Sequence, residues 1–237
     1  MRILRPIKSL KLRTLTFSLT TLLLIGVSSQ TVHAKFLHPK ITKKETTIRN
    51  VVVLPAKVNV VRDSMKGPEG MAAESDELSV RVEEKIAEVL SKQKNVATLP
   101  RSSDATNADS QKYDFADFQT KFDALLPTIV KKRSDVKKGR FSMGDEVLNL
   151  NLSKSADAIV FIRGEGKKLT GGKTAFRLMV GGTPAYLKLQ IGMVDTRSGE
   201  VLLYTDTMLV GDPTTAMDRL RKSLEKGFKK LPSAGAP

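Results

Sequence analysis

Apolar residues recur along this chain in patterns that predict a mixed β-sheet with helices packed on it. Short runs rich in valine, isoleucine and leucine are typical of strands that are buried on one or both faces. Such runs occupy residues 50–55, 96–99, 157–163, 185–194 and 200–209, and Val58, Val60 and Val61 extend the first beyond a kink. The last two runs flank a turn in which Gly199 suits a positive φ, which predicts a C-terminal β-hairpin. We therefore expect one mixed sheet of about five strands, in the α/β or α+β class.

Other segments have apolar residues at three- and four-residue spacing, which predicts amphipathic helices. These helices are expected over residues 75–94, from Asp114 to Val130, over residues 144–155, and from Asp212-Pro213 onward as the final helix. The acids Asp76 and Glu77 suit the first turn of the first helix, behind Ser75 as its cap. Residues 64–73 and 101–112 lack such periodicity and are expected to be loops.

The first 34 residues have the features of a secretory signal peptide. Five bases without an acid precede an apolar run at residues 15–27, and Val32-His33-Ala34 resembles a cleavage site. An uncleaved anchor is the alternative, although the run is shorter than the ~20 apolar residues that a membrane span needs. We therefore expect a periplasmic or secreted protein with a signal peptide over 1–34. A basic leader over 35–49, a single domain over 50–231 and a disordered tail over 232–237 would follow it.

Composition limits the chemistry that the chain can perform. The 237 residues include no cysteine and two histidines, with a formal net charge of +15. Disulfides and thiolate metal sites are therefore excluded, and cleavage after Ala34 would leave His38 as the one histidine. A Ser-His-Asp triad would depend on that residue, which lies in the expected leader. The composition thus favours a non-enzymatic binding role, and we expect no cofactor.

One glycine-rich segment, residues 164–174 (GEGKKLTGGKT), looks like a phosphate-binding loop but has the wrong spacing. That motif needs four residues between its first glycine and Gly-Lys-Thr, and counting back from Gly172 reaches Lys167. A long helix should also follow the loop, and residues 175–180 are too short for one. We expect a flexible basic hairpin tip here instead of a nucleotide site.

Basic residues concentrate in residues 131–140 (KKRSDVKKGR), which contain six bases and one acid, and around the glycine-rich segment. Such concentrations attract anionic surfaces, although a solvated exterior without a specific ligand is the alternative. Nucleic-acid readers interleave exposed aromatic residues, which this chain offers too sparsely, so we expect no nucleic-acid partner. The candidate binding residues are Lys131, Lys132, Arg133, Lys137, Lys138, Arg140, Arg163, Lys167, Lys168 and Lys173.

Three short motifs, in their order along the chain, resemble a bacterial envelope superfamily. They are Val53-Leu54-Pro55, Ala156-Asp157-Ala158, and Val194-Asp195 followed by Ser198-Gly199-Glu200-Val201. The superfamily includes the N-terminal domain of the Tol-Pal propeller protein, the lipoprotein activators of penicillin-binding proteins and the curli-secretion channel.

This resemblance implies a mixed sheet with helices on its faces and a role in protein–protein contact. The chain departs from several relatives because it lacks their lipid-anchor cysteine, so a soluble periplasmic form is expected. The expected partner is an envelope protein; anionic lipid, lipopolysaccharide or wall polymer is the alternative. The partner's identity and the oligomeric state stay open.

Overall fold

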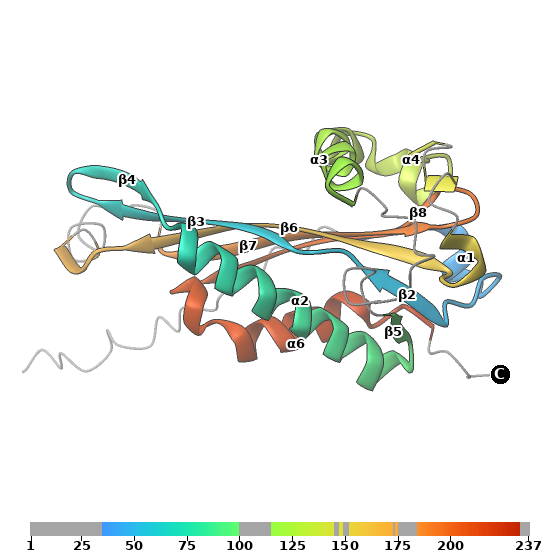
Figure 1. The fold of residues 1–237 in the computed structure, drawn as a ribbon. Helices are drawn as coiled ribbons and strands as arrows, with labels where there is room; N and C mark the ends of the chain where they lie inside the picture. The colour runs from blue at the N-terminus through green and yellow to red at the C-terminus, as the bar shows by residue number, and fades with distance from the viewer. Residues whose placement is uncertain are drawn as a thin grey trace, which may run out of the picture.

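One mixed sheet of eight strands separates two layers of helices (Figure 1). The computed structural model describes residues 35–99, 115–144, 147–148, 152–172, 174 and 184–232. Helices α2 (Ala72–Lys94) and α6 (Met217–Phe228) cover one face of the sheet. Helices α3 (Phe115–Lys131) and α4 (Arg133–Lys137) lie on the other face. The predicted class, a mixed sheet with helices packed on it, is confirmed, with more strands than the five or so expected.

The sheet combines a parallel half with an antiparallel half. Its main strand order is β1-β8-β7-β6-β2-β5, and β3 lies beside β6 where β2 ends and pairs with β4 as a hairpin. Strands β2 and β3 are both parallel to β6, whereas β6, β7, β8 and β1 are mutually antiparallel neighbours. The strands are β1 (Lys35–Leu37), β2 (Asn50–Val53), β3 (Lys57–Ser64), β4 (Gly67–Gly70), β5 (Ala97–Leu99), β6 (Ala158–Leu169), β7 (Tyr186–Asp195) and β8 (Val201–Val210).

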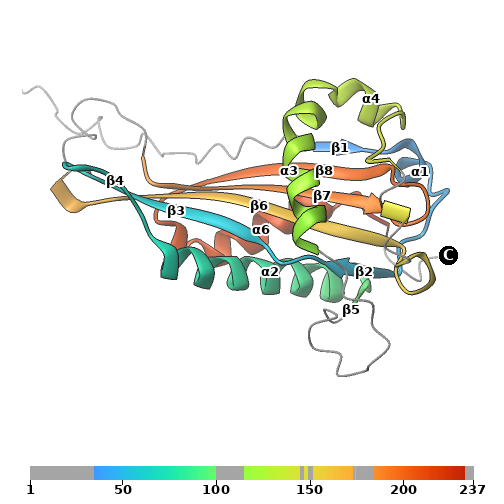
Figure 2. The same cartoon turned by 45° about the horizontal axis from the view of Figure 1, so that its top comes forward.

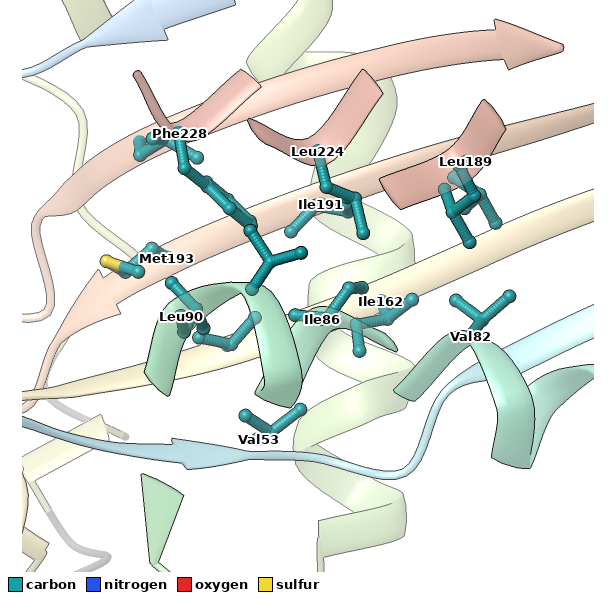
Figure 3. Close-up of a cluster of buried hydrophobic side chains, with 14 of the residues drawn as sticks. Val53, Val82, Ile86, Leu90, Ile162, Leu189, Ile191, Met193, Leu224 and Phe228 are labelled. Atoms are coloured by element: carbon teal, nitrogen blue, oxygen red, sulfur yellow. The ribbon is translucent and has the colours of Figure 1, made fainter. Parts of the chain in front are cut away.

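The larger core lies between the sheet and helices α2 and α6. Alternate residues of the strands point to this face, where they meet the apolar stripes of the two helices. Figure 3 shows this packing, to which α2 contributes Val82, Ile86 and Leu90, α6 contributes Leu224 and Phe228, and the strands contribute Val53, Ile162, Leu189, Ile191 and Met193. Burying each large apolar side chain stabilises the fold by about 1.5–3 kcal/mol.

The second core lies beneath α3 and α4 and covers only part of the opposite face. The ring of Phe122 in α3 stacks on Phe161 of β6 with centroids 4.4 Å apart, and Ile129 and Val136 are fully buried beside them. Beyond Phe161 the residues of β6 on this face become polar, starting with Arg163. Figure 2 shows α3 crossing the strands near one end of the sheet, so that β3, β4 and β6 extend past it. No described helix covers this extension on the α3 side.

The expectation that residues 35–49 form a leader outside the core is wrong. Residues 35–37 form the edge strand β1, which pairs with β8, and the Phe36 ring stacks on Tyr204 with centroids 5.7 Å apart. Ile41 and Ile48 are 2% and 0% exposed. A three-residue strand and isolated apolar residues produce too little periodicity to be recognised in a sequence.

Four other local expectations need correction. Residues 164–169, expected to belong to a flexible hairpin tip, continue strand β6, and residues 67–70 of an expected loop form β4. Gly164 and Gly166 of β6 allow close packing, since a Cβ on Gly164 would lie 2.7 Å from the Leu189 side chain. Helix α2 begins at Ala72, before the expected Ser75. In the helix expected over residues 144–155, the described part contains the short 3-10 turn η2 (Leu152–Lys154).

The remaining helices and strands match the sequence in type. The expected strands at 50–55, 96–99, 157–163, 185–194 and 200–209 and the two long helices are confirmed, and α1 (Pro39–Thr42) is a further single turn. Asp212 caps the 3-10 turn η3 (Pro213–Thr215), and the final helix α6 follows it. The predicted signal peptide, the loop over 101–112 and residues 233–237 of the predicted tail lie outside the described residues.

Candidate functional site

Six bases form an exposed surface on the α3–α4 layer. They lie at the end of α3, on α4 and in the turn that follows it, and all six side chains are exposed. In the described part of the chain, none of the six forms an ion pair with a carboxylate. We call this set the α4 cationic surface: Lys131, Lys132, Arg133, Lys137, Lys138 and Arg140.

The α4 cationic surface rests on the N-terminal segment that was expected to be a leader. Val136 of α4 is fully buried, and the Nζ of Lys137 lies 5.6 Å from the centre of the Phe36 ring. Gly139 has a φ of +67°, and its Cα faces the imidazole of His38, where an added Cβ would lie 2.4 Å from Nε2. The turn that presents the last bases is therefore packed directly on the histidine.

His38 belongs to a small polar network beneath this surface. It is 3% exposed, and its Nδ1 accepts a hydrogen bond from the Lys40 backbone N–H at 3.1 Å, which caps α1. Its Nε2 lies 3.8 Å from Glu200 Oε2 and has no hydrogen-bond partner among the described residues. Although burial acts to raise the pKa of Glu200, hydrogen bonds donated by Lys40 and Ser198 hold it below its ordinary value. The one histidine after residue 34 is thus part of the structural support of the surface.

The three bases that β6 contributes to the predicted binding residues are paired with carboxylates. Arg163 forms a two-point ion pair with Asp123 of α3, and burial lowers its pKa. On the same face, Lys167 Nζ lies 2.9 Å from Asp63 Oδ2. Lys168, on the opposite face, lies 3.1 Å from Glu74 and 3.8 Å from Asp212.

The structure therefore divides the candidate residues predicted from the sequence. Lys131, Lys132, Arg133, Lys137, Lys138 and Arg140 lie together, whereas Arg163, Lys167 and Lys168 lie on β6 and are paired with acids. Figure 2 shows α4 and the far end of β6 at opposite ends of the sheet. Lys173 lies outside the described residues.

Another group of lysines caps the end of α6. The ammonium group of Lys35 donates to the Gly227 carbonyl, and Lys94 Nζ donates to the Lys229 carbonyl at 3.2 Å. Burial and the neighbouring charges of Lys230 and Lys94 lower the pKa of Lys35 to about 8. Lysine side chains commonly satisfy the carbonyls at helix C-termini, so these contacts have a structural explanation.

A second candidate site, which the sequence did not indicate, is a pocket on the uncovered face of the sheet beside α3. The pocket has a cavity volume of about 270 Å³. Asp123 and Leu126 of α3 form its wall. We call this site the sheet pocket. Besides Gly164, the strand residues that line it are polar, and they are Lys57, Asn59, Arg163, Glu165, Lys188 and Gln190. The sequence did not reveal this pocket for two reasons. Its strand residues come from β3, β6 and β7, which are distant in sequence, and alternating polar residues in a strand normally indicate a solvent-exposed face.

The described residues contain neither a metal-binding cluster nor a membrane-spanning helix. No group of three histidine, aspartate or glutamate side chains is placed to hold a metal ion. Among the helices of the described part of the chain, none combines the length and the apolar character needed to cross a membrane.

Comparison with known proteins found similar folds and no family. No protein-family model and no curated protein matches the chain. The chain is similar to the PelC dodecamer from Paraburkholderia phytofirmans, with a TM-score of 0.41 and 12% identity over 86% of this chain and 98% of that chain. It is also similar to lipoprotein GNA1162 from Neisseria meningitidis, with a TM-score of 0.33 and 11% identity over 76% and 96% of the two chains.

A third similar structure is the LpoB C-terminal domain from Salmonella enterica. Its TM-score is 0.27, with 9% identity over 72% of this chain and 93% of that domain. At these scores and identities the likenesses assign no function to this chain.

Proposed function

We propose that this protein is an exported, non-enzymatic adaptor of the bacterial cell envelope that docks an acidic protein partner on the α4 cationic surface. The observation that carries the proposal is the contrast between the two groups of bases. Those on β6 are paired with acids within the fold, whereas the six on α3 and α4 are exposed without a carboxylate partner among the described residues.

The support beneath the surface favours a protein partner. Val136, Phe36 and His38 fix α4 and the turn after it, so the bases project from a packed layer of the fold. A backbone that is already fixed loses little loop entropy on binding, which favours a partner of matching shape. Opposite charges on that partner would also accelerate encounter by electrostatic steering.

The burial and hydrogen bonding of His38, the one histidine among the described residues, agree with a non-enzymatic role. His38 is buried, and its Nδ1 is used to cap α1. No serine or threonine hydroxyl donates a hydrogen bond to its ring among the described residues. The described contacts of His38 thus support the turn after α4 and cap α1, as expected of a structural histidine and not of the general base beside a nucleophile.

Charge reversal tests the proposal. The variant K131E/K132E/R133E/K138E reverses four bases of the surface and leaves Lys137 on the Phe36 ring. We expect capture of the envelope partner by the purified protein, measured by quantitative mass spectrometry after cross-linking, to fall by at least about tenfold, which corresponds to ~1.4 kcal/mol. The melting temperature should stay nearly unchanged, since exposed side chains are replaced.

The matched control changes net charge equally at scattered exposed lysines. It is the variant K66E/K154E/K222E/K226E, and it should capture the partner as the unaltered protein does. Equal losses in both variants would show that net charge alone governs capture, which contradicts the proposal. Retention on anionic vesicles or wall sacculi that is lost with the α4 surface alone, without a captured protein, would support the polymer or lipid alternative instead.

A further inference from the structure

The sheet pocket places six polar side chains in two rows across three strands. In the first row Lys57, Arg163 and Gln190 are register partners, and in the second row Asn59, Glu165 and Lys188 are. Neighbouring strands lie about 4.8 Å apart, and residues two positions apart on a strand are separated by about 6.6 Å. The carboxylate of Glu165 is therefore flanked by an amide on one side and an ammonium group on the other.

Two of these six side chains already interact with other side chains of the fold. Arg163 is held by Asp123 of the α3 wall, and the Gln190 amide donates to the Tyr204 hydroxyl at 2.9 Å. In the described part of the chain, the other four side chains have no hydrogen bond or ion pair. They are Lys57, Asn59, Glu165 and Lys188. The pocket thus presents two ammonium groups, one carboxylate and one amide.

We propose that the sheet pocket binds an acidic α-amino acid, a small ligand with two carboxylates and one ammonium group. The ligand's ammonium group donates to Glu165, and its carboxylates accept from Lys57 and Lys188, which lie on opposite sides of the pocket. The apolar Leu126 on the α3 wall contacts the methylene carbons. Charge-assisted hydrogen bonds of this kind are the strongest that such a ligand can form.

Charge balance selects this ligand over its simpler analogues. A dicarboxylate without an amine leaves Glu165 unpartnered and repelled by the ligand. A monocarboxylic amino acid leaves one of the two lysines unpartnered. A cavity of about 270 Å³ is slightly smaller than the ~300–1,000 Å³ range of small-molecule sites, which suits a ligand as small as an amino acid. The inference is independent of the adaptor proposal, because the pocket shares no residue with the α4 cationic surface.

Calorimetric titration of the purified protein tests the inference. The probes are L-glutamate, glutarate, which lacks the amine, and 4-aminobutyrate, which lacks the α-carboxylate. We expect L-glutamate to bind at least about tenfold more tightly than either analogue. The variant E165Q should remove the preference for L-glutamate over glutarate, and K188M should remove the preference over 4-aminobutyrate.

Controls separate loss of the site from loss of the fold. The variant K222M alters an exposed lysine of α6 and should leave all three affinities unchanged. Melting temperatures and amide NMR spectra of E165Q and K188M should match those of the unaltered protein. No detectable heat or chemical-shift change with L-glutamate at millimolar concentration would overturn the inference. So would glutarate binding as tightly as L-glutamate, or unchanged preferences in variants that keep the fold.

Discussion

At the scale of single residues, Gly192 is the position that lets α3 pack on the sheet. It lies in β7 directly beneath the ring of Phe122, and an added Cβ would lie 2.5 Å from two of the ring carbons. That ring is stacked on Phe161 and is 0% exposed, so it has no free space to move into. Close packing of this kind is felt when even one methyl group is added.

Substituting Gly192 with alanine should therefore destabilise the fold. We expect G192A to lower the free energy of unfolding by about 1–3 kcal/mol, the usual cost of overpacking. Urea denaturation followed by circular dichroism measures this change. G70A is the control, because a Cβ at Gly70 meets nothing within 4 Å. A second change, F122L, should recover part of the loss; G192A as stable as the unaltered protein would contradict the close contact.

At the scale of elements, helix α2 completes the hydrogen bonds of strand β3. Beyond its pairing with β6, β3 has N–H groups that face α2. The Ser75 hydroxyl accepts from the Val60 N–H at 2.9 Å, and the Ser79 hydroxyl accepts from the Val58 N–H at 3.0 Å. Covering a strand edge with a helix also blocks edge-to-edge association. Ser75, which the sequence indicated as a helix cap, thus has another task.

Removing the Ser79 hydroxyl tests this role of α2. We expect S79A to lower the free energy of unfolding by about 1–3 kcal/mol, because the buried Val58 N–H loses its acceptor. Hydrogen exchange at the Val58 amide should accelerate in the same variant. The control S91A lies on the same helix at an exposed position and should be neutral or slightly stabilising. Unchanged exchange at Val58 in S79A would refute the assignment.

At the scale of the whole molecule, the first strand and turn belong to the folded unit. Phe36 and Val136 lie in the same apolar cluster, while Ile41 and Ile48 lie in the larger one. The segment before Asn50 therefore contacts both layers of the molecule. Losing one large buried side chain typically costs 2–5 kcal/mol, and a native domain is stable by only about 5–15 kcal/mol.

A truncation experiment follows from this arrangement. We expect a chain that begins at Asn50 to be largely unfolded at 25 °C, whereas a chain that begins at Lys35 melts cooperatively. Circular dichroism melting curves of the two chains measure the difference. The single variants F36A and I41A in the longer chain should each lower the melting temperature. Similar melting curves for the two chains would show that residues 35–49 do not stabilise the fold, as expected of a leader.

Periodicity in the sequence was sufficient for the long elements and for the class of the fold. The valine run before Pro55, the stripe of α2 and the alternation in β7 each repeat often enough to identify a strand or a helix. It failed for β1 and β4, which are too short to repeat. Periodicity also gave the wrong prediction at Gly164 and Gly166. Glycines in a sequence usually indicate a loop, but these two lie within β6, where the absence of a Cβ allows neighbouring side chains to pack closely.

The candidate sites depended on tertiary structure to a greater extent. The sequence by itself determined where most of the long strands and helices lie, how basic the chain is, and that His38 is the one histidine beyond residue 34. Only the folded sheet decided which bases are neutralised, since Arg163 meets Asp123 from 40 positions away. It also brought Lys57, Glu165 and Lys188 into one pocket. Backbone patterns are local, whereas charge pairing and pockets arise from strands and helices that are distant in sequence and adjacent in space.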